Sequence, residues 1–496
     1  MLKILTSTQI RDLDAFTIEH EPIASIDLME RACRGIVNWL IDRYDAGHKV
    51  GVVCGPGNNG GDGLGVARLL KEWGYPVHVW IVEGGSPSVD FLENRRRLPA
   101  AIPVTEVRQA TDFQPDQMQI LIDALFGTGL TKPLKNIFEE VVQKINAQEA
   151  IRISIDIPSG LPADAPLQGV AVHAHHTLTF QLPKLSFLFP SSYPYTGDWE
   201  VLDIGLDKRF LKTISTPHFW ITRGGVRKLL RKRSRFSHKG DYGHAVLVAG
   251  STGKAGAAVL AARAALRSGV GLLTVQTPSG CHAILQASVP EAMTMPDVNP
   301  DHISETMSID RFRCVGMGPG LGQHQQSVAV LRNYLRVGLP MVLDADALNI
   351  LSQHPDWITS IPSGSILTPH PGEFQRLVGD WRDDFHRLEL LKELAARTNA
   401  ILVLKGACTS IATPDGRVFF NSTGNPGMAT GGTGDVLTGM ITGLLARGYE
   451  AEKAAILGVY LHGLAGDLAA RELGQESLIA GDLIDFLPAA FRYLQG

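Results

Sequence analysis

Short runs of β-branched and other apolar residues alternate with helical patterns in two successive parts of the chain. In the first part, between residues 49 and 204, the runs are VGVVC (50–54), VHVWIV (77–82), ILIDAL (120–125), IRISIDI (151–157), HTLTF (176–180) and WEVLDI (199–204). Strands that alternate with helices in this way predict a parallel sheet covered by helices on its faces. We therefore expect an α/β domain here.

A second, longer series begins at His244. Its runs are HAVLVAG (244–250), LLTVQT (272–277), RCVGMG (313–318), MVLDAD (341–346), SILTPH (365–370), ILVLKG (401–406) and SIATPDGRVFF (410–420), with an alanine-rich helical pattern at 256–269. This series predicts a second, larger α/β domain. The periodicity weakens over 206–235, so we place the boundary near 212–225 and expect domains at 1–215 and 222–496.

The weakly patterned stretch contains a basic run at Arg227, Lys228, Arg231, Lys232, Arg233 and Arg235. Such a run can mark a phosphate or nucleic-acid site. Val226, Leu229 and Leu230 between these charges have helical spacing, which favours the solvated face of a helix. We assign no function to it.

Charge and cysteine content narrow the class of protein. Among 496 residues, 46 lysines and arginines oppose 50 acidic residues, a formal net charge of −4, which argues against a protein that mainly binds nucleic acid or an anionic membrane. The five cysteines have no CxxC spacing, which indicates neither a disulfide framework nor a zinc ribbon. The N-terminus lacks the apolar stretch of a signal peptide, and we expect a cytoplasmic protein.

The first apolar run leads directly into GPGNNGGDG (55–63), after which we expect a helix over 64–73. Such a loop brings backbone N–H groups and a helix N-terminus to an anion. It is neither the dinucleotide GxGxxG motif nor a Walker A loop. Asn58, Asn59 and Asp62 add side-chain oxygens, although Asp62 could instead simply cap the helix.

Two further strand ends carry polar side chains. Asp123 precedes FGTGL (126–130), and Asp156 precedes IPSG (157–160). The carboxyl ends of parallel strands converge on one crevice, although each aspartate alone could be a turn residue. Asn59, Asp123 and Ser159 are hard oxygen donors, which suit an alkali or alkaline-earth cation.

Three histidines, His173, His175 and His176, suggest a metal site at first sight. In a strand His173 and His175 share one face and His176 points to the other. We therefore favour an ordinary half-exposed strand.

A second glycine-rich loop lies near the C-terminus, where GGTGD (431–435) runs into an apolar helix. Backbone N–H groups beside a carboxylate are what phosphoryl transfer to an alcohol requires, because the donors stabilise the phosphoryl charge and the carboxylate accepts the hydroxyl proton. Asp435 could equally cap the helix.

Several motifs together resemble known families. GGTGD, with ILVLKGACT (401–409) upstream, resembles the ribokinase-like superfamily, and GSTGKAGAAVLAA (250–262), GMGPGLG (316–322), LDADALN (343–349) and LTPHPGEF (367–374) resemble its ADP/ATP-dependent NAD(P)H-hydrate dehydratases. GPGNNGGDG, DALFGTGL and SIDIPSG resemble NAD(P)H-hydrate epimerases. The order is that of fused bifunctional NAD(P)H-hydrate repair enzymes. The resemblance implies an N-terminal Rossmann-like three-layer domain and a C-terminal ribokinase-like domain.

The resemblance also implies the activity. The N-terminal domain would interconvert the R and S hydrates of NADH and NADPH, and the C-terminal domain would dehydrate the S epimer at the expense of ADP, which becomes AMP and phosphate. Neither nucleic acid nor a membrane is implied as a partner, and a homo-oligomer is left open. The alternative is a small-molecule kinase of the same superfamily, such as a hydroxymethylpyrimidine or thiazole kinase, fused to a non-catalytic nucleotide-sensing domain.

Site residues follow from the resemblance position by position. The first domain would bind the hydrate through Asn58, Asn59, Gly60, Gly61, Asp62, Gly127, Thr128, Gly129, Leu130, Thr131, Lys132, Pro133 and Asp156, and K⁺ through Asn59, Asp123 and Ser159. The second would bind the nucleotide, with Mg²⁺, through Lys405, Gly406, Ala407, Cys408, Thr409 and Gly434, and the hydrate through Ala257, Gly320, His370 and Asp435. Asp435 and Asp156 would be the catalytic residues.

Overall fold

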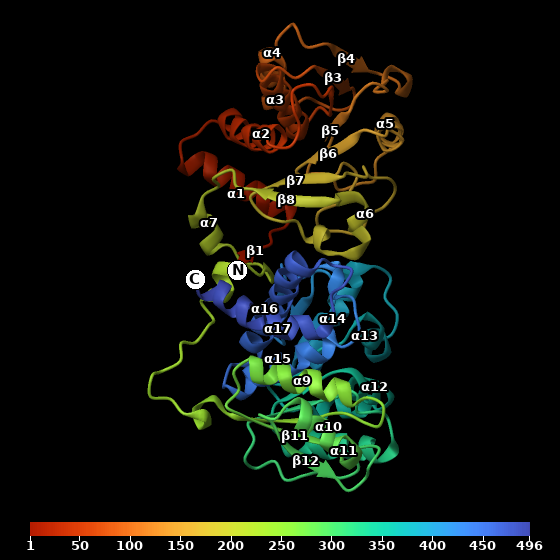
Figure 1. The fold of residues 1–496 in the computed structure, drawn as a ribbon. Helices are drawn as coiled ribbons and strands as arrows, with labels where there is room; N and C mark the ends of the chain where they lie inside the picture. The colour runs from red at the N-terminus through yellow and green to blue at the C-terminus, as the bar shows by residue number, and fades with distance from the viewer. The chain divides into compact units, whose positions relative to one another are not determined.

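The computed structural model describes all 496 residues, and the chain divides into two compact units. One unit contains Lys3–Thr216 with Asp383–Phe385, and the other contains Met1–Leu2, Pro217–Arg382 and His386–Gly496. The helices and strands of each unit are labelled in Figure 1. No helix combines the length and the apolar character needed to cross a membrane.

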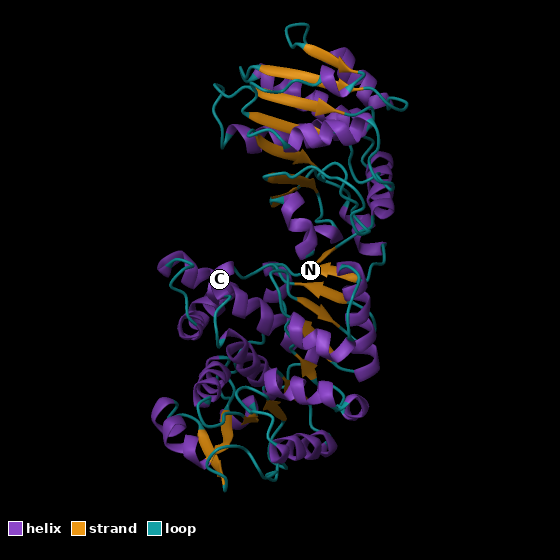
Figure 2. Cartoon of the chain, turned by 90° about the vertical axis from the view of Figure 1, so that its right-hand side faces the viewer, coloured by secondary structure: helices purple, strands orange, loops and turns teal.

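The first unit is built on a seven-stranded sheet in the order β4-β3-β2-β5-β6-β7-β8, in which every neighbouring pair is parallel. Figure 2 shows these strands side by side with helices along them. The strands are β2 (Val50–Cys54), β3 (Val77–Val82), β4 (Val104–Val107), β5 (Ile120–Ala124), β6 (Ile151–Ile155), β7 (His176–Phe180) and β8 (Asp198–Leu202).

Alternating side chains of this sheet form two apolar clusters, one on each face. Val52 and Cys54 pack with the apolar faces of α2 and α3, whereas Val53 packs with α5. The three-layer α/β architecture is therefore confirmed. The helices are α1 (Ser7–His20), α2 (Ser25–Ile41), α3 (Asn58–Glu72), α4 (Val89–Arg97), α5 (Ile137–Asn146), α6 (Tyr193–Thr196) and α7 (Lys208–Thr213).

The second unit contains an eleven-stranded sheet in the order β1-β9-β18-β17-β16-β15-β14-β13-β10-β11-β12. Strands from β12 to β16 in this order are parallel, while β17 pairs antiparallel with both β16 and β18. The single run expected at 410–420 is in fact this β17–β18 hairpin, because a turn at 413–417, with Gly416 at φ +85°, divides it.

The strands of this sheet are short. They are β1 (Leu2–Lys3), β9 (His218–Trp220), β10 (His244–Val248), β11 (Leu272–Pro278), β12 (Met293–Asp297), β13 (Cys314–Met317), β14 (Met341–Leu343), β15 (Ile366–Leu367), β16 (Ile401–Leu404), β17 (Ser410–Ala412) and β18 (Val418–Phe420).

Four helices, α9, α15, α16 and α17, share one apolar cluster with this sheet. The helices α9 and α15 approach closely, since a Cβ added at Gly439 would lie 2.0 Å from the carbonyl oxygen of Ala261. The helices are α8 (Arg223–Arg227), α9 (Ala255–Arg267), α10 (His282–Ser288), α11 (Gln325–Val337), α12 (Ala345–Gln353), α13 (Pro371–Val378), α14 (Asp384–Thr398), α15 (Thr433–Ala446), α16 (Ala451–Leu473) and α17 (Ala480–Gln495).

The basic stretch is not the helix that its spacing suggested. The helix α8 ends at Arg227, and the following residues form turns and coil. Arg231 and Arg233 instead donate hydrogen bonds to the carbonyls of Gly448 and Gly269, at 3.0 and 2.6 Å. These carbonyls lie just beyond the C-termini of α15 and α9, where helices leave acceptors unpaired and favour positive charge.

The strand order reverses between β2 and β5 in the first sheet and, within the parallel run from β12 to β16 of the second sheet, between β10 and β13. In open α/β sheets, ligands bind beyond the carboxyl ends of the strands at such a point. The segments that follow these four strands are therefore the first places to look for a site.

The close packing of α9 against α15 leads to a stability prediction. We expect Gly439→Ala to lower the free energy of unfolding of the second unit by roughly 1–3 kcal/mol, because the new Cβ meets a backbone carbonyl that cannot rotate away. Gly256→Ala is the matched control in α9, since nothing lies within 4 Å of its added Cβ, and we expect it to be neutral or stabilising by about 0.5–1 kcal/mol. Urea unfolding checks both, and equal midpoints would contradict the packing argument.

Candidate active sites

The glycine-rich segment after β2 is mostly helical. The helix α3 begins at Asn58, with Gly57 as its N-cap, so the expectation of a loop up to Gly63 and of Asp62 as a cap is wrong. The glycines allow this, because a Cβ at Gly60 would lie 1.8 Å from the carbonyl oxygen of Gly55. The first turns of α3 are thereby buried against the ends of β2 and β5, and so are the side chains of Asn59 and Asp62.

Asn59 leaves one polar atom without a partner. Its Nδ2 donates to the carbonyl of Ile155 at 2.9 Å, whereas its Oδ1 is buried and accepts no hydrogen bond. Buried oxygens normally have a partner, so this one marks a place for a ligand with positive charge or a donor.

Asp123 lies at the end of β5 and is 1% exposed. Its carboxylate accepts hydrogen bonds from the Ser159 hydroxyl at 2.6 Å, the Ser159 N–H at 2.9 Å, the Ser154 hydroxyl at 2.8 Å and the Leu125 N–H at 3.3 Å. Burial raises its pKa, and these hydrogen bonds oppose that rise. The predicted cation ligands Asp123 and Ser159 are thus in direct contact, and Asn59 bonds to the end of the neighbouring strand β6.

Asp156 follows β6 in a left-handed conformation, φ +66°, which non-glycine residues adopt rarely and often at functional sites. Its Oδ1 lies 2.8 Å from the Nζ of Lys184 and accepts a hydrogen bond from the Phe180 N–H at 3.2 Å. Lys184 is 1% exposed, and the sequence analysis did not select it. The available signal was a lysine shortly after the strand at 176–180, at the same edge of the sheet.

Two more carboxyl groups lie near this ion pair. Burial, followed by the negative charge of Asp156, raises the pKa of Asp14 to about 7, with Lys184 acting in the opposite direction. Burial and the charges of Asp156, Asp14 and Asp90 raise the pKa of Asp62 well above its ordinary value. Asp14 could not be selected from the sequence, since nothing in its helix distinguishes it from Asp12.

The loop that follows β5 contains the other predicted hydrate-binding residues. Leu130, Thr131, Lys132 and Pro133 line a small hollow of about 180 Å³ together with Ser7 and residues from the segment 160–168. Gly127 contacts Asn59, because its added Cβ would lie 3.4 Å from that side chain, and Thr128 and Gly129 connect the two parts of the loop.

The three histidines do not converge. β7 begins at His176, so His173 and His175 precede the strand instead of sharing a face of it. His175 accepts a hydrogen bond from the Arg152 N–H at 3.0 Å, and the His173 ring lies 4.8 Å from that of Tyr195, tilted by 53°. No group of three or more His, Cys, Asp or Glu side chains is arranged to hold a metal.

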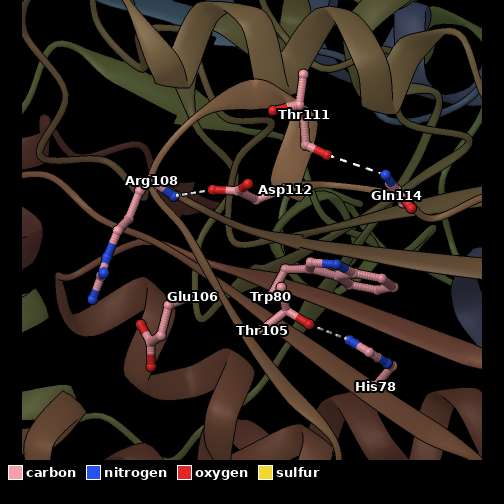
Figure 3. A pocket seen from close by; sticks show the side chains of 8 residues that line it. All are labelled: His78, Trp80, Thr105, Glu106, Arg108, Thr111, Asp112 and Gln114. Carbon is pink, nitrogen blue, oxygen red and sulfur yellow. Dashed lines mark hydrogen bonds between the residues drawn. The ribbon is translucent and has the colours of Figure 1, made fainter.

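A larger hollow of about 700 Å³ lies at the β4 edge of the sheet (Figure 3). None of the predicted site residues lines it. Its polar groups pair with one another: His78 Nε2 lies 2.9 Å from the Thr105 hydroxyl, and the Arg108 N–H donates to Asp112 at 3.0 Å. We therefore find no unpaired group there that points to a ligand.

In the second unit, one cavity of about 710 Å³ lies beside the N-terminus of α15. The predicted nucleotide residues Lys405, Gly406, Ala407, Thr409 and Gly434 line it. His370, predicted to face the hydrate, lines the same cavity and caps α13, where its Nδ1 accepts the N–H groups of residues 372 and 373. Cys408 does not line the cavity, and burial raises its pKa to about 11.

Asp435 lies in the first turn of α15, whose N-cap is Gly432, so Asp435 does not cap the helix. Burial and then the negative charge of Asp344 raise its pKa to about 6, while Lys405 opposes the rise. A carboxylate of this kind is ionised at neutral pH and is a stronger base than an ordinary aspartate.

Asp344, at the end of β14, is the buried centre of this charge cluster. Lys405 Nζ lies 2.8 Å from its Oδ1, and the Thr438 hydroxyl donates to its Oδ2 at 2.6 Å. The same lysine lies 3.9 Å from Glu373. The sequence analysis placed Asp344 in a family motif but gave it no role.

Ala257 and Gly320 meet where the strand order of the second sheet reverses. An added Cβ at Gly320, which has φ +60°, would lie 3.1 Å from the Cβ of Ala257. His462, also missed from the sequence, lines the cavity, and its Nε2 lies 2.9 Å from the carbonyl of Thr433. Burial lowers its pKa to about 4, so it is neutral and donates this hydrogen bond.

Comparison with known proteins connects both units to one group of enzymes. A family described as NAD(P)H-hydrate dehydratase matches residues 245–489, and a family described as YjeF-related protein N-terminus matches residues 25–186. A bifunctional NAD(P)H-hydrate repair enzyme of Moorella thermoacetica is 38% identical, over 99% of this chain and 97% of that protein. The corresponding Escherichia coli protein is 35% identical, over 93% and 88%.

Solved structures match the second unit. A ribokinase-like superfamily protein of Enterococcus faecalis is 27% identical with a TM-score of 0.50, over 57% of this chain and 99% of that one. An ADP/ATP-dependent NAD(P)H-hydrate dehydratase of Bacillus subtilis, co-crystallised with ATP and Mg²⁺, is 36% identical with a TM-score of 0.48, over 56% and 98%. The match to the Enterococcus faecalis protein confirms the ribokinase-like fold of this unit.

The ion pair between Lys405 and the buried Asp344 leads to a second stability prediction. We expect Lys405→Met to lower the free energy of unfolding of the second unit by roughly 3 kcal/mol, because it leaves the Asp344 charge buried without its partner. Adding Asp344→Asn should restore most of the loss, since asparagine is uncharged and still accepts the Thr438 hydroxyl. Urea unfolding of the single and double variants checks this, and an additive double variant would refute the pairing.

Proposed function

The chain belongs to the family of bifunctional NAD(P)H-hydrate repair enzymes, and we propose that its two sites perform the two steps of that repair. The enzyme interconverts the R and S hydrates of NADH and NADPH and dehydrates the S form. We assign epimerisation to residues 1–215 and dehydration to residues 222–496, in keeping with the two family matches.

For dehydration, the difficulty is that hydroxide is a poor leaving group. We propose that ADP phosphorylates the ring hydroxyl, so that phosphate leaves instead, and that Asp435 accepts the hydroxyl proton. The observation that carries this proposal is the half-buried carboxyl of Asp435, with a pKa of about 6, beside a cavity lined by Lys405 and Gly434. The N–H groups of residues 431–434 would stabilise the transferring phosphoryl group, and Mg²⁺ bound to the nucleotide would offset its phosphate charge.

Asp435→Asn tests this assignment. Asparagine keeps the shape of the side chain but cannot accept a proton, so we expect dehydration to fall by about 10²–10⁴-fold while ADP affinity and R-to-S epimerisation are unchanged. NADH absorbance measures dehydration, calorimetry measures ADP binding, and Asp356→Asn, an exposed residue, is the control. In the wild type, dehydration should decline as the pH falls through about 6, because Asp435 is then protonated. More than a tenth of wild-type activity in the variant would exclude this role.

For epimerisation, we propose a K⁺ site formed by Asn59, Asp123 and Ser159. The support is the chemistry of the donors: the buried Oδ1 of Asn59 has no partner, and the hydroxyl and carboxylate oxygens of Ser159 and Asp123 lie at the ends of the adjoining strands. Hard oxygen donors suit such an ion. A bound cation would supply positive charge toward an oxyanion or phosphate of the substrate.

Exchange of K⁺ for tetramethylammonium at constant ionic strength should slow epimerisation, and added K⁺ should restore it, because the organic cation is too large for buried donors. Asp123→Asn should weaken the response to K⁺ as well. Chromatographic separation of the epimers measures the rate, and dehydration of the S epimer by the same sample is the internal control. An epimerisation rate that is unchanged by both the cation exchange and Asp123→Asn would refute the K⁺ site.

A further inference from the structure

The polar face of α1 forms a wall of the epimerase site. Ser7, Arg11 and Asp14 have the i, i+4, i+7 spacing of one helical face. Ser7 lines the hollow next to residues 130–133, and Arg11 Nη1 lies 4.0 Å from a Cβ added at Gly129. The first two residues of this face thus meet the loop that the family resemblance assigns to substrate, although α1 lies before the residues matched by the family, 25–186.

Apolar packing determines this orientation of α1. Leu13 and Thr17 are buried on its other side, and Leu13 shares an apolar cluster with Leu182 and Leu206. Leu182 is two residues from Lys184, so the packing that holds α1 also places Asp14 next to the buried ion pair. The Thr17 hydroxyl fixes the helix further by accepting the Asp207 N–H at 3.0 Å.

Asp14 faces charged groups from three other elements. They are Asp156 after β6, Lys184 after β7, and Asp62 in α3, while Arg11 lies one turn before Asp14 on the same face of α1. Lys184 is directly paired with Asp156, 2.8 Å away. Asp14 and Asp156 therefore share the positive charge of one lysine, which is paired with Asp156, and Asp14 is the half-buried member of the two.

Asp14 and Asp156 lie in different environments, which suit them to different chemical roles. Asp14 has a pKa of about 7, so a large fraction of it carries a proton at neutral pH. Asp156 accepts hydrogen bonds from the Phe180 N–H and from the Thr179 hydroxyl besides its pairing with Lys184. Two carboxyl groups in unlike environments in one site are suited to act as acid and base.

We infer that Asp14 is a second catalytic residue of epimerisation, the proton donor that works with Asp156 as proton acceptor. This inference rests on the proposed function. The carboxyl of Asp14 protonates the hydroxyl on C6 of the ring, the C6–O bond breaks, and water leaves while the N1 lone pair stabilises the C6 cation. Water then adds from the opposite face, a new C6–O bond forms, and Asp156 takes the surplus proton. The proton returns to Asp14 through solvent, and no oxidant or reductant is required.

Asp14→Asn in the full chain tests the role. We expect R-to-S conversion of an R-enriched hydrate, followed chromatographically without ADP, to fall at least about 100-fold, as for loss of a general acid. ADP-dependent dehydration of the S epimer should not change. Asp12→Asn is the matched control, because Asp12 is an exposed aspartate on the same helix, and its conversion rate should equal that of the wild type. Conversion by Asp14→Asn within threefold of the wild type would overturn the inference.

Two further readouts separate catalysis from a structural role. Burial disfavours the charged form of Asp14, so Asp14→Asn should leave the melting temperature at pH 8 unchanged or raise it, whereas a structural role requires a decrease. In the wild type, the conversion rate should fall as the pH rises through about 7, when Asp14 loses its proton. In Asp14→Asn this decrease with pH should be absent. A flat wild-type profile between pH 6 and 8 would overturn the inference even if the variant did not fold. A wild type without any epimerisation would instead refute the proposed function itself.

Discussion

In each site a single lysine lies near more than one carboxyl group. Lys184 and Asp156 are 2.8 Å apart in the first unit, and Lys405 and Asp344 are 2.8 Å apart in the second. In both cases the lysine and the aspartate follow strands of the central sheet, so the sheet itself holds the pair together. Each lysine lies nearest to one aspartate, and a further carboxyl group in the same site lies near the negative charge of that aspartate.

This imbalance explains how two unrelated folds obtain carboxyl groups with raised pKa. Asp14 reaches about 7 and Asp435 about 6, and in both the second cause after burial is the aspartate that is paired with the lysine. Under the proposed roles, Asp435 accepts the proton of a substrate hydroxyl and Asp14 donates one. A raised pKa suits both roles, because it makes a carboxylate a stronger base and keeps a carboxyl group partly protonated near neutral pH.

The sequence predicted the location of both sites because glycine and the strand ends are local signals. GPGNNGGDG and GGTGD mark the junctions of β2 with α3 and the start of α15, and Asp123 and Asp156 lie at the strand ends where they were expected. The charge clusters could not be predicted in the same way. Asp14 lies 142 residues before Asp156 and is distinguished from Asp12 only by the side of α1 that packs inward. Lys184 similarly acquires its role from a neighbouring strand.

The glycines in these motifs are needed for the charge clusters, because they allow the helices to pack closely against the strand ends. Glycine is unfavourable inside a helix, which disfavours a helix that begins at residue 58. The close packing outweighs that cost. Any side chain at Gly60 would meet the carbonyl of Gly55 and move the start of α3 away from the sheet, and Asn59 and Asp62 would move with it. At Gly434 an added Cβ would lie 3.4 Å from Lys405 Nζ and 3.7 Å from Asp344 Oδ2, within the charge cluster itself. The glycines therefore bring the starts of α3 and α15 close to the strand ends, where Asp62 and Asp435 lie near the carboxyl groups that follow the strands.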